Sequence, residues 1–358
     1  MCSPILSADS TVPVLDFSNW SDTNETSSRE DFLKTWDYAF RTFGFVMLVN
    51  HGLEKKYRAL NSELELFFQL PIQEKMTFRI SEEYGHGGYT PRGQESVSQT
   101  FLDPAKLSRP PDAVESLVLS DQNIQGRPSL ENGYKNDRLL QEYQALKNGL
   151  SKLSLSVMEL MAICLGLRRD FFFEFYEGKK NAMKDIRAAH YFVEPLEKDS
   201  SLPYGEHTDY TGFTFLWRNS ENGLQCRDPR NLENSETKNP ERDIHTEPKA
   251  AWLNVPILEG YEDAIVINAG DLIERWTNSY WISNVHRVTG QNPSHNARSS
   301  SRAGPISIVH FTGPAGNTEI HVLTESAKVR ATGAVREEWK TPITADEHLW
   351  MKLNASNG

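Results

Sequence analysis

The chain has 358 residues, of which 38% are hydrophobic and 24% charged, and its formal net charge is −11 at pH 7. These proportions are typical of a globular protein with a sizeable core, and an acidic chain without a basic block does not favour a nucleic-acid partner. The three cysteines are far apart, which argues against a disulfide framework and against a Cys-x-x-Cys metal site. We expect a cytoplasmic protein, since neither a signal-peptide pattern nor a membrane-spanning run of roughly 18 apolar residues is present.

The first part of the chain alternates between apolar strands and amphipathic helices. Apolar residues three or four positions apart predict helices, and short continuous apolar runs predict buried strands. The expected strands are residues 12–17 and 45–49, and the expected helices are residues 31–42, 52–70 and 137–165. Residues 81–100 are rich in glycine and polar groups, which indicates a loop that could carry binding residues. We expect residues 103–135 to be irregular, and His51, beside a glycine at a turn, to have a structural role.

The second part of the chain is a succession of short strand-like runs. The runs are residues 186–193, 211–217, 224–227, 251–255, 264–268, 281–288 and 306–311. Many short strands without intervening helices predict a sandwich or barrel, jelly rolls included. Residues 228–249 interrupt the series as a charged loop, and Thr344 with Glu347 forms a capping box that predicts a terminal helix. We expect one composite domain, made of a helix-rich region 1–185, a jelly-roll core 186–313 and a C-terminal segment 314–358.

Residues 203–216 carry a possible metal site. This run is rich in aromatic and β-branched residues and is predicted to be a strand, so His207 and Asp209 would project to the same side. His286, at the end of another predicted strand, adds a second imidazole. Two histidines and one carboxylate leave open positions on a non-haem Fe(II). The sequence therefore predicts His207, Asp209 and His286 as metal ligands.

Motifs along most of the chain resemble those of one family. They are Val12–Asp16, Gly44–Gly52, Phe67–Pro71, Gly88–Glu95, His207-x-Asp209, Gly223–Gln225, Trp252–Pro256, Asn268–Asn278, His286 with Arg302, and Pro342–Thr344. In this order they resemble the isopenicillin N synthase-like branch of the 2-oxoglutarate and Fe(II)-dependent oxygenases. The resemblance implies a mixed α+β protein whose double-stranded β-helix, or jelly-roll, core is flanked by N-terminal and C-terminal helices. It also implies an oxidoreductase, a dioxygenase that uses Fe(II), dioxygen and 2-oxoglutarate as cosubstrate.

The resemblance implies roles for individual residues around the iron. Arg302 would pair with the distal carboxylate of 2-oxoglutarate, because a guanidinium matches a carboxylate with two parallel hydrogen bonds. Arg298 is the nearby alternative, and Tyr191 would bind the same carboxylate through its hydroxyl. The family's arginine is normally followed two residues later by serine, but position 304 here is glycine. Ser307 or another group must then supply the hydroxyl.

The resemblance implies oxidation of an unactivated C–H bond in a small-molecule metabolite. Hydrogen abstraction by a ferryl would lead to hydroxylation, desaturation or oxidative ring closure, and an amino-acid-derived substrate of specialised metabolism is a candidate. No protein acid or base is assigned, because the chemistry is centred on the iron. The residues proposed for substrate binding are Tyr89, Arg92, Glu95, Phe192, Trp217 and Arg227. The alternatives are an Fe(II) oxidase of the same fold that does not use 2-oxoglutarate, and a non-catalytic jelly-roll binding protein.

Overall fold

A computed structural model describes most of the chain. The described residues are 12–21, 26–79, 88–94, 112–119, 136–176, 185–192, 203–228, 252–290 and 304–357. Of the residues singled out in the sequence, Glu95, Arg298 and Arg302 lie outside these ranges, as does almost all of the charged segment 228–249.

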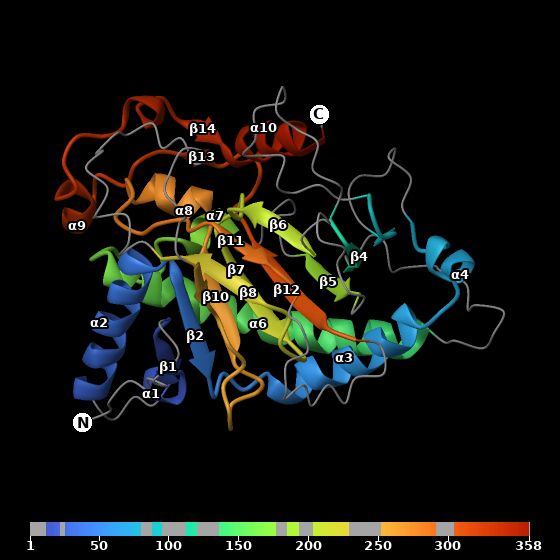
Figure 1. The fold of residues 1–358 in the computed structure, drawn as a ribbon. Helices are drawn as coiled ribbons and strands as arrows, with labels where there is room; N and C mark the ends of the chain where they lie inside the picture. The colour runs from blue at the N-terminus through green and yellow to red at the C-terminus, as the bar shows by residue number, and fades with distance from the viewer. Residues whose placement is uncertain are drawn as a thin grey trace.

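Two β-sheets form the centre of the described structure (Figure 1). The eight-stranded sheet has the order β1 (Val14–Asp16), β2 (Phe45–Val49), β10 (Ile265–Ala269), β7 (Phe213–Arg218), β12 (Ile306–Thr312), β5 (Ile186–Tyr191), β4 (Val114–Leu119) and β3 (Gly88–Thr90). The four-stranded sheet has the order β6 (Tyr204–His207), β11 (His286–Val288), β8 (Leu224–Arg227) and β9 (Trp252–Asn254). The paired strands are antiparallel, except that β1 runs parallel to β2.

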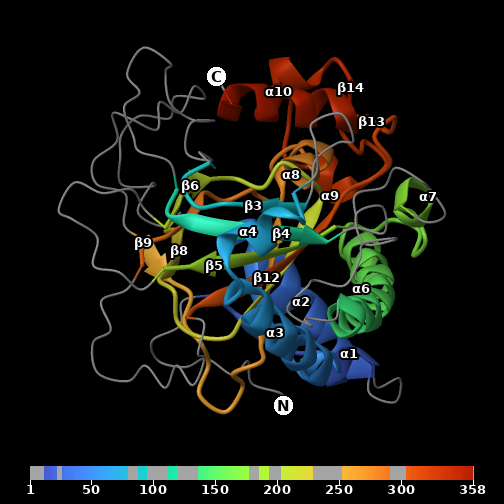
Figure 2. The ribbon, with the colours of Figure 1, turned by 90° about the vertical axis from the view of Figure 1, so that its right-hand side faces the viewer.

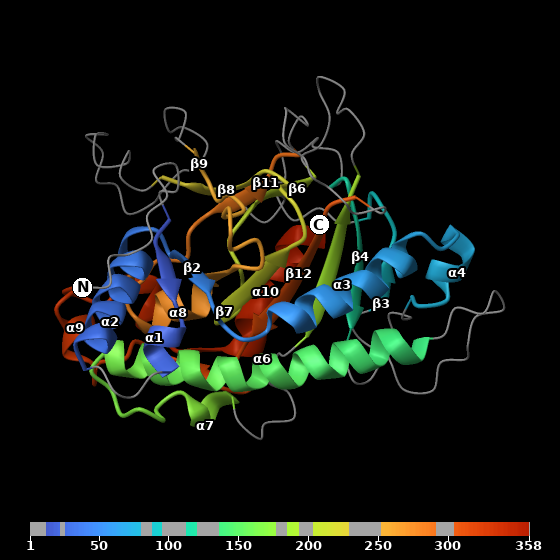
Figure 3. The same cartoon turned by 90° about the horizontal axis from the view of Figure 1, so that it is seen from below.

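Helices cover the face of the large sheet that points away from the small sheet. Figure 3 shows α3 (Glu54–Phe68) and α6 (Asn136–Cys164) side by side below the large sheet, with β6, β8 and β11 on its opposite side. Near one end of α6 lies α2 (Thr26–Thr42). The shorter helices are α1 (Ser18–Ser21), α4 (Ile72–Met76), α7 (Phe173–Tyr176), α8 (Asp271–Trp276), α9 (Ala327–Arg330) and a 3₁₀ turn at Glu337–Trp339. None of the described helices has both the length and the apolar character needed to cross a bilayer.

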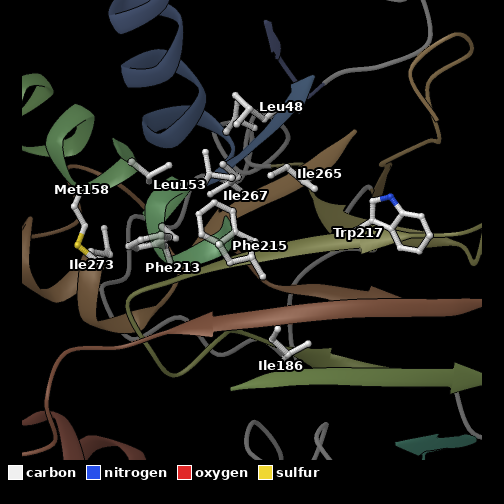
Figure 4. Packing of buried hydrophobic residues seen from close by; sticks show 14 of the residues in the cluster. Leu48, Leu153, Met158, Ile186, Phe213, Phe215, Trp217, Ile265, Ile267 and Ile273 are labelled. Atoms are coloured by element: carbon white, nitrogen blue, oxygen red, sulfur yellow. The ribbon is translucent and has the colours of Figure 1, made fainter. Parts of the chain in front are cut away.

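The main core lies between the large sheet and these helices. Phe213, Phe215 and Trp217 all project from β7 into this core (Figure 4). Side chains alternate along a strand, so the residues between them, Thr214 and Leu216, project toward the small sheet. The face of β7 that looks away from the helices is therefore the face available to a site between the sheets.

The C-terminal helix α10 (Ala345–Asn357) lies over the ends of β6 and α8 (Figures 1 and 2). It follows the small antiparallel pair β13 (Glu319–Ile320) and β14 (Ile343–Thr344). The predicted capping box is present at its start. Glu347 N–H donates to Thr344 Oγ1 at 3.2 Å, and Thr344 N–H donates to Glu347 Oε2 at 2.8 Å.

Three expectations from the sequence were wrong in their local structure. Residues 103–135 were expected to be irregular, but β4 lies among them and pairs on both sides, with β3 and with β5. Residues 203–216 were expected to form one strand, but β6 ends at His207, because the next backbone groups bond elsewhere: the Asp209 carbonyl accepts from Asp271 N–H. Residues 281–288 were expected to be a strand, but Ile282 N–H donates to the Phe40 carbonyl at the end of α2, and β11 begins only at His286.

Candidate active site

The three predicted metal ligands lie together between the sheets. His207 is the last residue of β6, and His286 is the first residue of β11, directly opposite it in the antiparallel pair. Asp209 follows in the loop after β6, and its Oδ1 is 3.8 Å from the Nε2 atom of each histidine. One potential ligand atom from each residue lies within 4.8 Å of the others, and all three residues are buried. Strand pairing and a loop bring them together, where the sequence argument relied on alternation along a single strand.

Backbone carbonyls fix the orientation of both imidazole rings. His207 Nδ1 lies 2.8 Å from the Gly205 carbonyl, and His286 Nδ1 lies 3.2 Å from the Asn284 carbonyl. A carbonyl can only accept, so each Nδ1 carries a proton and each Nε2 faces Asp209. Burial, followed by the neighbouring His286, lowers the pKa of His207 well below its ordinary value. At neutral pH the ring is therefore uncharged and able to donate its lone pair to a metal ion.

Two further side chains fix the carboxylate of Asp209. Its Oδ2 accepts a hydrogen bond from Thr214 Oγ1 at 2.5 Å and another from Asn268 Nδ2 at 2.6 Å. Thr214 comes from β7 and Asn268 from β10, which are adjacent strands of the large sheet. Oδ1 is left facing the two imidazoles. Two imidazole nitrogens and one oriented carboxylate oxygen form a set that fits Fe(II) and leaves coordination positions open.

The supporting roles of Thr214 and Asn268 were not found from the sequence. In the sequence, Asn268 stands out only as part of a motif, and Thr214 only as part of a strand-like run. The signal that could have found Thr214 is its place on the face of β7 opposite the aromatic residues. Which residues face Thr214 across the site, however, is set by strand pairing between segments that are distant in sequence.

A cavity of about 460 Å³ extends from the triad between the two sheets. Polar and apolar residues both line it, but most of the exposed cavity surface is apolar, with Phe45, Leu216, Leu224, Val288 and Val309 contributing to it. The volume lies in the range of small-molecule sites, about 300 to 1,000 Å³. The metal ligands thus open onto a space that can hold small molecules.

Helix α10 forms one wall of the cavity. Leu349 and Leu353 line it, and the polar side of the helix is tied to α8. His348 Nε2 is 3.2 Å and Lys352 Nζ is 2.9 Å from Asp271 Oδ2. Burial alone would raise the pKa of Asp271, but these two partners lower it below its ordinary value. The ionised carboxylate therefore holds α10 over the site.

The residues proposed to bind 2-oxoglutarate are placed as follows. Tyr191 of β5 and Ser307 of β12 both line the cavity, and Ser307 Oγ accepts a hydrogen bond from Asn222 Nδ2 at 3.1 Å. Ser307 therefore brings a hydroxyl to the site, where Gly304 has none. Arg302 lies outside the described residues, so its role stays a prediction.

Two of the residues proposed for substrate binding belong to the packing of the fold. Trp217 stacks on Tyr57, with ring centroids 5.6 Å apart. Trp217 lies on the helical side of the large sheet (Figure 4). The hydroxyl of Tyr89 donates to Glu115 in a buried cluster that also contains Lys75. Neither aromatic ring is among the residues that line the cavity.

Arg92, Phe192 and Arg227 are not among the residues that line the cavity. Arg92 is exposed, and its guanidinium carbon is 4.5 Å from the centroid of the Phe192 ring. Arg227 ends β8 three residues after Leu224, so the two side chains lie on opposite faces of the strand, and Leu224 is the one in the cavity wall. The segment 88–94 does reach the cavity, through Thr90 and Gln94. Glu95 lies outside the described residues.

Comparison with known proteins identifies the family. Residues 12–140 match the family model described as non-haem dioxygenase in morphine synthesis N-terminal, and residues 184–311 match that of the 2OG-Fe(II) oxygenase superfamily. Over 287 residues the chain is 27% identical to gibberellin 20 oxidase 1 of Arabidopsis thaliana, covering 79% of this chain and 67% of that protein. It is 28% identical over 301 residues to the 2-oxoglutarate-dependent dioxygenase tropC of Talaromyces stipitatus, covering 78% of this chain and 82% of that protein.

The structural comparison gives the same fold. The crystal structure of a full-length Neurospora crassa protein in complex with alpha-KG superimposes with a TM-score of 0.71, at 24% identity, over 98% of each chain. This likeness confirms the predicted double-stranded β-helix fold. The family model and the similarity to the dioxygenase tropC confirm the enzyme class, a 2-oxoglutarate-dependent dioxygenase. The chain belongs to the 2OG-Fe(II) oxygenase superfamily.

Proposed function

We propose that this chain oxidises a C–H bond of a small-molecule metabolite, with His207, Asp209 and His286 as the ligands of Fe(II). The observation that carries the proposal is the set of three oriented donor atoms at the wall of a cavity of about 460 Å³. When bound, Fe(II) supplies the oxidative chemistry with dioxygen and 2-oxoglutarate, which is converted to succinate and carbon dioxide. The protein's part is to hold the ligands, orient the substrate and exclude water.

The two ends of the cavity suit different occupants. Ser307 and Phe311 both line it from β12, and the four-residue interval between them corresponds to roughly 13 Å along a strand. Ser307 and its partner Asn222 make one part of the lining polar, whereas Leu349 and Leu353 of α10 make another part apolar. We place 2-oxoglutarate at the Ser307 end and the substrate toward α10. The apolar wall there excludes water and favours a substrate with an apolar body.

The outcome of the reaction depends on how the substrate is held, and the three possibilities have different products. Hydroxylation adds one oxygen to the substrate, whereas desaturation or ring closure removes two hydrogens. An amino-acid-derived metabolite with an apolar portion fits the size and lining of the cavity.

The experiment is a screen of small metabolites for substrate-stimulated succinate formation by the Fe(II) protein, followed by mass analysis of the product. His207→Ala is the control, and we expect it to show no stimulation by any compound. Oxidation of a metabolite without succinate would favour the oxidase that does not use 2-oxoglutarate. Succinate formation that is the same in His207→Ala would contradict the assignment of the triad.

A further inference from the structure

A buried arginine lies behind the Ser307 end of the cavity. Arg218 is the last residue of β7, is 2% exposed, and pairs directly with Ser307 in the ladder between β7 and β12. Alternation along β7 puts it on the same face as Thr214 and Leu216, which line the cavity. A positive charge is thus enclosed between the two sheets, next to the polar end of the site.

The charge of Arg218 is only partly neutralised by the protein. Its Nη1 donates to Asn222 Oδ1 at 3.4 Å and its Nη2 to the Pro256 carbonyl at 3.2 Å. Among the described residues, the carboxylate within 4 Å is that of Glu221, at 3.8 Å, and its side chain is 40% exposed. Burial lowers the pKa of Arg218, yet a guanidinium keeps its proton in proteins. A buried cation with a distant, solvent-facing counter-ion is costly unless a second anion approaches it.

Asn222 connects this charge to the cavity wall. Because a guanidinium can only donate, it fixes the amide of Asn222 with Oδ1 toward Arg218 and Nδ2 toward Ser307. Ser307 Oγ then accepts from the amide, and no other described group accepts its hydroxyl hydrogen. Since Asn222 and Ser307 both line the cavity, their polar atoms meet any ligand at this end. The wall here presents a hydroxyl donor backed by a positive charge, which is the environment that a carboxylate requires.

The sequence around Ser307 agrees with this arrangement. If Ser307 is the serine of the Arg-x-Ser pattern, the arginine would stand two residues earlier, where this chain has Pro305. A proline side chain has no hydrogen-bond donor and no charge. Arg218, on the adjacent strand and opposite Ser307, brings a guanidinium to the same end of the cavity.

We propose that Arg218, Asn222 and Ser307 form the site for the distal carboxylate of 2-oxoglutarate in this chain. Ser307 contacts the carboxylate, and Arg218 is a positioning residue that acts through Asn222 and supplies the balancing charge. The proposal rests on the proposed use of 2-oxoglutarate at the triad. It replaces the expectation that Arg302 is the principal cation for this group.

The test compares two α-keto acids that differ only at the distal end. The Fe(II) protein is titrated without oxygen with 2-oxoglutarate and with 2-oxobutanoate, which lacks the distal carboxylate. The visible charge-transfer band of the bound keto acid reports the Kd of each without turnover. We expect the wild type to prefer 2-oxoglutarate. Arg218→Gln should weaken 2-oxoglutarate binding between about tenfold and a hundredfold, with less than about a twofold change for 2-oxobutanoate.

The outcomes distinguish binding of the distal carboxylate by this site from a merely structural role of Arg218, and both from a failure of the proposed function. Equal weakening of both keto acids, or no change in either, overturns the inference, because the effect would not depend on the distal carboxylate. If Arg302→Gln removes the preference while Arg218→Gln keeps it, the inference is overturned as well. If Arg218→Gln does not fold, Ser307→Ala and Arg218→Lys decide in the same assay, with the smaller loss expected for the lysine. No band with either acid in the wild type would contradict the proposed function itself.

Discussion

Replacing Thr214 by valine removes one of the two hydrogen bonds that orient Asp209. Valine keeps the branched shape of threonine, so the backbone preference of β7 changes little. Thr214 and Asp209 are both buried, and Thr214 Oγ1 lies 2.5 Å from Asp209 Oδ2. A hydrogen bond to a charged group contributes about 1.5 to 3 kcal/mol, which corresponds to roughly tenfold to a hundredfold in an equilibrium constant. We expect Thr214→Val to weaken Fe(II) binding by that factor, as loss of a hydrogen bond to a metal ligand typically does.

The assay is an anaerobic titration of Fe(II) against a competing chelator, with Thr211→Val as the matched control. Thr211 is also buried and also lines the cavity, but its hydroxyl has no hydrogen-bond partner among the described residues. Thr211→Val should therefore change the Kd for Fe(II) by less than about threefold. Equal affinities for the wild type and both variants would refute the claim that Thr214 holds Asp209 for the metal. An equal loss in both variants would show a general loosening of the site.

Three further predictions concern stability. Glu115→Gln should lower the free energy of unfolding by about 3 kcal/mol at pH 7. Burial alone would raise the pKa of Glu115, but its hydrogen bonds to His190, Lys75 and Tyr89 lower it below its ordinary value. In urea titrations, the stability difference between wild type and Glu115→Gln should therefore shrink as the pH falls through the folded pKa of Glu115. A stability difference that does not depend on pH would contradict this prediction. Gly44→Ala should cost more than about 2 kcal/mol, because Gly44 has φ +67° and a Cβ would lie 2.3 Å from the Ile282 carbonyl oxygen. Gly52→Ala is the control: Gly52 has φ +79° and no atom within 4 Å of a built Cβ, so this change should cost about 1 kcal/mol. Equal melting temperatures for the Gly44→Ala and Gly52→Ala variants would contradict the clash with the Ile282 carbonyl. Lys352→Met removes the ion pair with Asp271 and should destabilise the docking of α10 by about 1 kcal/mol. We expect faster hydrogen exchange in α10 alone, and unchanged exchange would show that this ion pair does not hold the helix.

The sequence predicted the elements that have a strong local pattern. Residues 45–49 are a continuous apolar run and form β2, and the apolar stripe over residues 137–165 becomes α6. Strand β4 was missed because its neighbours in sequence are rich in proline and polar residues. It forms because β3 and β5 pair with it on either side, which local composition does not reveal.

The sequence predicted which residues come together at the site better than which residues support them. His207, Asp209 and His286 were named from residue type and motif. Trp217 was proposed for substrate binding from the family resemblance. It shares the aromatic face of β7 with Phe213 and Phe215, and that face packs toward the helices, which the sequence of the strand alone does not reveal. The position of Arg218 opposite Ser307 depends on the register between β7 and β12, which pairs segments distant in sequence.

The most direct test of the central claim is the iron content of the protein. The wild type and His207→Ala are reconstituted with Fe(II) without oxygen, and circular dichroism verifies that both are folded. The assignment of His207, Asp209 and His286 predicts about one iron per chain in the wild type and little in the variant, because one of three ligands is lost. Equal iron in the two proteins would contradict it.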